Sequence, residues 1–434
     1  MRVTRCCRWA LVVLLAAAAP AAGAQVVTPR DVSAALAVGP DGRAFLVSPS
    51  ARPGARTRSA IRRRTALPGA AFGPSRVLMR PGAGDRPVDA GVAADGSGVI
   101  VLQRVRGARR SVRAVAFGPR GAPGRPIALS GPGERADFAA SAVAPSGAAV
   151  VVWFGHRGAG RWRLEAATRA PGARGFGAPE PLSSFVRRAC CTSVSVAIGE
   201  RGDAVATWSS TARPAVWAAL RSPGRAFRAP QRLAADASDL PRVVVGAGGA
   251  AALMYSTQHV PLRAGDGLQL HRAPPGGGFG PAEHVNGGGG VTIAAAAVTA
   301  AGRVLVAWSD RVHGARVHVS EAAAGAPLAA SAELGEDVRP RHLAVAADDL
   351  GRAVVAWSQR ASTTPAHRER AVAAMRVAGG APFGAAVALG GPWRAAEPGR
   401  AALVPGGGAL VLWGAARYGG PAQRRAALLV TRLP

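Results

Sequence analysis

Apolar residues gather in short runs that recur along the chain, and each run follows a turn of small residues. In residues 145–154, Gly147 is followed six residues later by Trp153, with apolar residues between them. The same interval returns four times, and three looser copies carry Tyr, Leu or Ser in place of Trp: Gly202 with Trp208, Gly302 with Trp308, Gly351 with Trp357, Gly407 with Trp413, Gly249 with Tyr255, Gly96 with Leu102, and Gly42 with Ser48. Eight copies at about 50-residue spacing indicate a repeat architecture.

Each repeat divides into four expected strands. The first is rich in small residues, as in 138–143, which suits a crowded position near a central axis. A glycine-containing hairpin turn follows. The second strand, such as 150–154, is apolar at nearly every position, which indicates that both of its faces are covered. The third alternates polar and apolar residues, as in 161–166, and the fourth carries the recurring phrase Phe-Gly-x-Pro-x-x-Leu, clearest in 176–182.

These features predict an all-β protein formed by a single β-propeller of about eight four-stranded blades. An alternative is seven blades plus a degenerate N-terminal repeat, because the first copy of the pattern is the most worn. Covered strands that end in Trp predict that the Trp side chains pack between blades rather than bind a sugar. The expected repeats start near residues 31, 88, 137, 191, 241, 291, 341 and 398.

The last repeat contains only three expected strands, of which 425–433 is the third. Residues 25–28 offer a short apolar strand ahead of the first repeat. We therefore expect the N-terminal segment to pair with the last blade and to close the ring, which would remove an open sheet edge.

The first 24 residues have the pattern of a cleaved secretory signal peptide. Three arginines precede an apolar run at 9–19, and Ala22-Gly23-Ala24 forms an A-x-A cleavage site before Gln25. Residues 25–434 would then form the propeller, secreted or associated with the cell envelope (periplasmic or extracellular). No second long apolar segment follows, so we expect no transmembrane segment after cleavage, although an uncleaved anchor is the competing interpretation.

The formal net charge is +30, and all of the basic side chains except histidine are arginine. Such a charge favours anionic partners: acidic glycans, wall polymers, anionic lipid or nucleic acid. A nucleic-acid channel would also need aromatic residues among the arginines, and only Tyr418 and Phe154 stand near the charged loops, which argues against that partner. Cys190 and Cys191 are adjacent, so two unbridged cysteines are favoured over a strained vicinal disulfide or a redox pair.

The topology of an up-and-down blade sorts its connections by face. Turns after the first and third strands open on one face, and loops after the second and fourth open on the other. Loops after the second strands vary in length and carry arginine and histidine, which as a ring suit a carboxylate, sulfate or phosphate ligand. The competing interpretation is that these loops are polar because they are solvated. The predicted ligand-binding residues are Arg109, Arg110, His156, Arg157, His259, Arg263, Arg311, His313, His367 and Arg368.

Acidic residues gather in the loops after the fourth strands, among them Asp85, Glu134 and Asp137. A glycosidase requires two facing carboxylates, but neighbouring arginines such as Arg86 and Arg135 favour ion pairs here. The histidines lack metal-ligand spacing, and no G-x-S-x-G motif is present. We therefore assign no catalytic residue, no metal and no cofactor.

The glycine turn, the apolar strand ending in Trp and the Phe-Gly-x-Pro-x-x-Leu phrase together resemble secreted bacterial β-propeller repeat proteins. The resemblance covers nearly all of 25–434 and implies architecture alone. The sialidase Asp box, the quinone-dehydrogenase repeat and the WD repeat all place their Trp differently, so no catalytic residues are carried over. The expected function is non-enzymatic binding, by a monomer, of an anionic glycan, a cell-wall polymer or a protein. The alternatives are a hydrolase or lyase acting on acidic polysaccharide and a structural surface protein.

Overall fold

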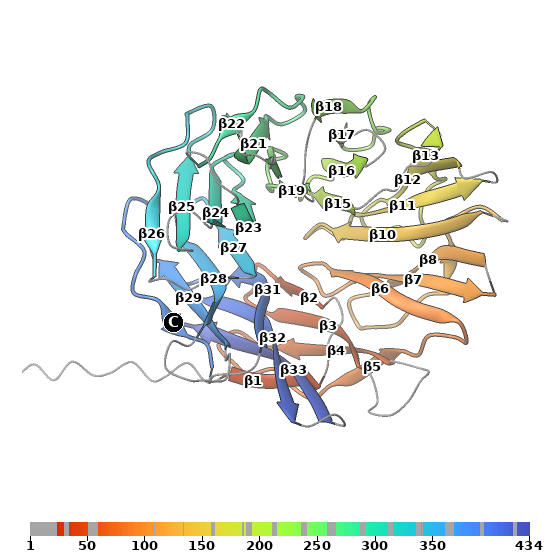
Figure 1. The fold of residues 1–434 in the computed structure, drawn as a ribbon. Coiled ribbons are helices and arrows are strands. Elements are labelled where there is room, and N and C mark those ends of the chain that lie inside the picture. The colour runs from red at the N-terminus through yellow and green to blue at the C-terminus, as the bar shows by residue number, and fades with distance from the viewer. Residues whose placement is uncertain are drawn as a thin grey trace, which may run out of the picture.

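The computed structural model describes residues 24–29, 34–50, 60–107, 109–132, 134–157, 161–184, 186–187, 193–210, 215–235, 241–257, 266–286, 291–310, 316–335, 340, 342–360, 369–390, 395–419 and 423–434. Within these ranges all regular elements are β-strands, and they form eight antiparallel sheets arranged around a ring (Figure 1). The predicted eight-bladed β-propeller is confirmed, and the seven-bladed alternative is not needed.

The strands of each blade follow one another in chain order. The first four blades consist of β2 (Ala35–Val38), β3 (Ala44–Ser50), β4 (Ala60–Ala66) and β5 (Arg76–Met79); β6 (Asp85–Val92), β7 (Gly98–Arg106), β8 (Arg109–Phe117) and β9 (Ile127–Ala128); β10 (Arg135–Val143), β11 (Ala149–Arg157), β12 (Arg161–Arg169), β13 (Glu180–Pro181) and β14 (Val186–Arg187); and β15 (Ser193–Ile198), β16 (Ala204–Ser210), β17 (Ala215–Arg221) and β18 (Gln231–Ala234).

The other four blades repeat this plan. They consist of β19 (Arg242–Val245), β20 (Ala251–Thr257), β21 (Gly267–Ala273) and β22 (Glu283–His284); β23 (Val291–Val298), β24 (Val304–Asp310), β25 (Val317–Ala322) and β26 (Ala332–Leu334); β27 (Leu343–Ala347), β28 (Ala353–Arg360), β29 (Glu369–Arg376) and β30 (Val387–Ala388); and β31 (Ala395–Leu403), β32 (Ala409–Gly419) and β33 (Gln423–Leu433), with β1 (Ala24–Pro29) as the fourth strand.

The ring closes through its first strands and through strand exchange. The first strand of each blade contacts the first strand of the next, and β31 contacts β2. At the outer edge of the last blade, β1 pairs antiparallel with β33, and Gln25 lies opposite Val430. The expected pairing of the N-terminal segment with the last blade is therefore confirmed.

A glycine with positive φ makes the turn between the first and second strands. In the third blade, Gly147 has a φ of 84° and donates its backbone N–H to the carbonyl of Ala144 at 2.9 Å. An L-residue with a Cβ rarely adopts this conformation, which explains why glycine opens the repeated pattern. The equivalent glycines, all with positive φ, are Gly42, Gly96, Gly202, Gly249, Gly302, Gly351 and Gly407.

The second strands form the core between blades. Trp153 is fully buried and packs against Val99 and Val112 of the preceding blade, and Trp357 packs in the same way against Leu305 and Val317. The expectation that these aromatic residues pack between blades is confirmed for the whole set. Their exposed fractions are 0–5% for Trp153, Trp208, Trp308, Trp357 and Trp413.

The fourth strands are shorter than the Phe-Gly-x-Pro-x-x-Leu phrase suggested. In the third blade, Glu180–Pro181 is the part of the phrase that pairs with β12, and the first half of the phrase forms the approach to that strand. Proline lacks the N–H that a continuous ladder needs, so the pairing stays short. The phrase still contributes to the core, because Phe72 and Phe279 are buried in two of the blades.

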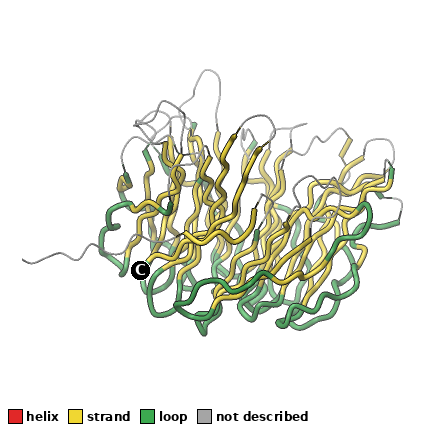
Figure 2. The backbone as a smooth tube through the Cα atoms, turned by 90° about the horizontal axis from the view of Figure 1, so that it is seen from below, coloured by secondary structure: helices red, strands yellow, loops and turns green. Residues whose placement is uncertain are grey.

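The two faces of the ring differ in character. We call the face with the turns after the first and third strands the turn face, and the opposite one the loop face. Figure 2 shows many of the described turns, in green, along the lower side of the molecule. Most of the loops after the second and fourth strands lie outside the described residues, so the loop face is described mainly by its strand ends.

Candidate binding site

Three of the ten predicted ligand-binding residues have described side chains: Arg109, Arg110 and His156. For Arg157 only the backbone, as the last residue of β11, is described. The other six predicted residues lie outside the described residues: His259, Arg263, Arg311, His313, His367 and Arg368. Cys190 and Cys191 also lie outside them.

Arg109 and Arg110 open β8 at the tip of the hairpin that it forms with β7. Arg109 lies opposite Arg106 and is exposed, so two guanidinium groups share the end of this hairpin. Arg110 instead turns toward the third blade, where its Nη1 donates to Asp137 Oδ1 at 2.9 Å. Nearly half of the Arg110 side chain, 44%, stays exposed.

Asp137 joins the second and third blades. Its carboxylate accepts from Arg110, from Arg135 Nε at 3.1 Å and from Gln103 Nε2 at 3.3 Å, while only 7% of the side chain is exposed. The ion pair with Arg135 was expected from the sequence, whereas the burial of the carboxylate was not. Two arginines and an amide satisfy the buried charge, which would otherwise be costly to desolvate.

Phe138 follows Asp137 at a bulge in the innermost strand of the third blade. The register between β10 and β11 shifts between Asp137 and Ala140, and Phe138 has a φ of 52°, the one positive value for a non-glycine residue in the described ranges. Phe138 is 59% exposed, and its ring lies nearly perpendicular to the ring of the buried Phe154, with the two centroids 6.5 Å apart. A strained, exposed aromatic residue of this kind is typical of a functional position.

His156 extends the cluster across the same blade. Arg135, His156 and Trp162 lie opposite one another on three successive strands, which places them side by side on the same face of the sheet. The His156 and Trp162 rings are 4.6 Å apart and tilted by 46°. We call Arg110, Arg135, Phe138, His156 and Trp162 the loop-face cluster.

Sequence reasoning missed Phe138 and Trp162. The sequence pattern places Phe138 in a small-residue first strand and Trp162 in an alternating third strand. The available signal was the contrast with other repeats, because a large aromatic residue stands where most first strands carry small ones. Phe154, one of the two aromatic residues noted near these loops, is buried instead.

The described carboxylates of the loop face are held by arginine or by backbone. Asp85 lies 3.5 Å from Arg113 and 3.8 Å from Arg104, and Glu134 accepts the N–H of Gly131 at 3.0 Å. Among the described residues no three His, Cys, Asp or Glu side chains are grouped so that they could hold a metal ion.

Asp89 is a carboxylate on β6, one of the innermost strands. Its Oδ2 accepts from the backbone N–H and the hydroxyl of Ser141 on β10, at 2.7 and 3.0 Å, and Oδ1 accepts from the N–H of Ala90. Burial within the ring raises the pKa of Asp89, while these hydrogen bonds and the charge of Arg400 oppose that shift. The side chain links two neighbouring blades at the centre of the molecule.

His271 is buried and hydrogen-bonded at both ring nitrogens. Its Nδ1 lies 2.8 Å from the carbonyl oxygen of Gly280, which can only accept, so Nε2 accepts from the Tyr255 hydroxyl at 3.2 Å. Burial lowers the pKa of His271 and raises that of Tyr255. Both groups therefore remain neutral and serve packing between the fourth and fifth blades.

Solved structures share the fold at low sequence identity. A structure from a study of two prolyl endopeptidases superimposes with a TM-score of 0.51 at 14% identity, over 90% of this chain and 54% of that one. The match with a NanB sialidase from Streptococcus pneumoniae has a TM-score of 0.38 at 8% identity and covers 95% of this chain and 68% of that one. The match with a polysaccharide lyase has a TM-score of 0.41 at 10% identity and covers 77% of this chain and 88% of that one.

No protein-family model matches the chain, and no curated protein sequence does. At 14% identity, the match with the prolyl endopeptidase structure shows a similar fold and does not indicate a shared function. The strand order and the closure of the ring show that the chain is an eight-bladed β-propeller repeat protein.

Proposed function

We propose that the protein is a secreted or envelope-associated binding protein that recognises an anionic glycan or wall polymer with its loop face. The observation that carries the proposal is the loop-face cluster, in which arginines from two neighbouring blades hold Asp137, and the next residue, Phe138, is an exposed aromatic residue with positive φ. The leader-like first 24 residues support export, and the described residues contain no helix long and apolar enough to cross a membrane.

The cluster combines the two contacts that an acidic sugar needs. Arg110 and Arg135 each direct one nitrogen to Asp137, and a guanidinium has five N–H donors, so both can also take a carboxylate or sulfate from solvent. Their side chains are 44% and 46% exposed. Phe138 presents an apolar ring face on which the C–H face of a sugar can stack.

Asp137 acts as a positioning residue in this scheme. Because it is buried and holds both guanidinium groups, it fixes their orientation before any ligand arrives. Preorganised side chains lose less conformational entropy on binding, which favours affinity. The net charge of +30 adds long-range attraction for polyanions.

The test is binding of the purified protein to polygalacturonate and to neutral dextran at about 0.15 M salt, where diffuse charge attraction is largely screened. We expect selective binding to the polyuronate, with affinity reduced about tenfold by R110Q, which removes a charge-assisted contact. F138G should weaken binding while maintaining stability, because glycine tolerates the positive φ at this position.

L350A is the matched control, because Leu350 is also an exposed apolar side chain but lies on the turn face. Equal binding by F138G, L350A and the unmodified protein would contradict the assignment of the site. Release of shortened or unsaturated sugars from the polymer would instead favour the alternative of a propeller hydrolase or lyase.

A further inference from the structure

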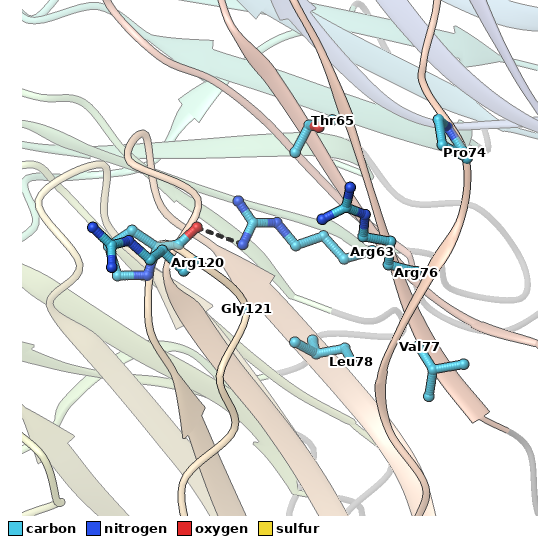
Figure 3. A pocket seen from close by; sticks show the side chains of 9 residues that line it. Arg63, Thr65, Pro74, Arg76, Val77, Leu78, Arg120 and Gly121 are labelled. Carbon is cyan, nitrogen blue, oxygen red and sulfur yellow. Dashed lines mark hydrogen bonds between the residues drawn. The ribbon is translucent and has the colours of Figure 1, made fainter.

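A pocket of about 530 Å³ opens between the first and second blades, away from the loop-face cluster. It is lined from one side by β4, β5 and the approach to β5, and from the other by the turn that follows β8 (Figure 3). A volume of this size is typical of pockets for small molecules. Its lining residues are Arg63, Thr65, Pro74, Arg76, Val77, Leu78, Pro119, Arg120 and Gly121.

Arg63 stands at a position that is apolar in all seven other blades. It lies opposite Val47, five residues after the turn glycine Gly42. The residues at the corresponding register position of the other third strands are buried between blades. They are Ala114, Ala166, Ala218, Leu270, Val319, Ala373 and Val430.

The fold therefore does not need an arginine here, and burial removes part of the water that would solvate the guanidinium charge. Burial lowers the pKa of Arg63, an effect that the charge of Asp95 partly opposes, and its Nε is buried without a hydrogen-bond partner. Residues that break a local rule of their fold are expected at functional or strained positions.

The guanidinium of Arg63 is nevertheless held in one place. It lies over the Phe45 ring at 5.1 Å, and its Nη1 donates to the carbonyl oxygen of Pro119 in the next blade at 2.5 Å (Figure 3). Arg76 lies opposite Arg63 on β5, and Arg120 follows Pro119 in the facing turn. Both are exposed, so three guanidinium groups surround the pocket.

A second pocket, between the fifth and sixth blades, provides an internal comparison. It has a volume of about 360 Å³, and its one arginine, Arg272, makes two hydrogen bonds to Glu283, at 2.6 and 2.9 Å. That positive charge is neutralised by the protein itself. In the pocket between the first and second blades, none of the nine lining residues is acidic.

We propose that the pocket between the first and second blades binds a sugar-sized molecule through its phosphate or sulfate group. Three arginines without a lining carboxylate suit a compact, strongly charged oxyanion, because guanidinium forks match its geometry. Thr65, the prolines and Leu78 provide a mixed polar and apolar wall for the remainder of such a molecule. This site is independent of the loop-face cluster.

The test is calorimetric titration of the full protein with glucose 6-phosphate, glucose 6-sulfate and glucose at matched ionic strength. We expect the esters to bind and glucose not to bind. Binding of the phosphate ester alone would identify a dianion site, and binding of both would identify a general oxyanion site. Absence of binding by both esters would overturn the proposal.

Three variants test whether the ester binds in the pocket between the first and second blades. R63L copies the residue found in the fifth blade and should reduce ester affinity by about tenfold or more while maintaining the fold. R120Q, at an exposed turn residue, should also weaken binding and does not depend on core packing. R225Q is the control, because Arg225 is exposed in the corresponding turn of the fourth blade. Equal losses in R225Q and R120Q would show a diffuse charge effect and contradict the site.

Discussion

Three polar side chains enclosed by the ring are satisfied by partners from neighbouring strands or blades. Asp137 holds arginines from two blades, and Asp89 accepts three hydrogen bonds at the centre. His271 is fixed between a carbonyl and a tyrosine hydroxyl. At the residue scale the sequence shows where charged groups occur, but several of their partners lie about 15 to 50 positions away along the chain.

His271 predicts a pH dependence of stability. Because burial lowers its pKa, the unfolded chain binds a proton more readily than the folded one, so stability falls as the pH drops below the unfolded-state value of about 6.5. The stabilising neutral form is fully present above that pH. H271Q should reduce the loss of stability between pH 8 and pH 5, measured by urea unfolding at both values.

H284Q is the control for this measurement, because His284 is also hydrogen-bonded on the neighbouring strand but is exposed. An unchanged pH dependence in H271Q, or an equal change in H284Q, would show that protonation of His271 does not control the acid response.

At the scale of elements, the hairpin of the first and second strands is the unit that repeats. A positive-φ glycine makes its turn, and a large side chain six residues later packs against the preceding blade. The third strand is more variable, and this is where Arg63 replaces an apolar residue and Trp162 joins the loop-face cluster. The repeated turns and their packed side chains therefore maintain the ring, and the third strand can vary in sequence without disturbing it.

The exchange of β1 into the last blade predicts a loss of stability on truncation. Deletion of residues 25–29 removes most of the pairing with β33 and exposes its edge. We expect the melting temperature to fall by at least about 5 °C and aggregation to increase, followed by calorimetry and light scattering. An unchanged melting temperature would show that the exchanged strand contributes little to ring closure.

At the scale of the whole molecule, the charge of +30 produces a field that is separate from any specific site. At low salt we expect weak binding to every polyanion tested, and this binding should vanish near physiological ionic strength because the Debye length falls to about 8 Å. Titration with dextran sulfate at increasing salt measures this component. Undiminished binding to all polyanions at physiological salt would contradict a purely diffuse effect.

The sequence by itself determined the architecture, because its rules act over short distances. A glycine turn, a strand covered on both faces and a Trp six residues further on are properties of one hairpin, and their repetition gives the number of blades. The missing fourth strand of the last repeat even indicated how the ring closes. Of the candidate site, the sequence indicated the loop arginines, His156 and the Arg135–Asp137 pair.

Only the tertiary structure decided which of these side chains meet. Arg110 of one blade contacts Asp137 of the next, and Phe138 lies at a bulge of β10. Arg63 and Arg120 line the same pocket from two different blades. Such contacts depend on how two sheets are set beside one another and on which way a strand end turns. These geometric relations join residues that no local pattern connects, so the binding surfaces became visible only in the assembled ring.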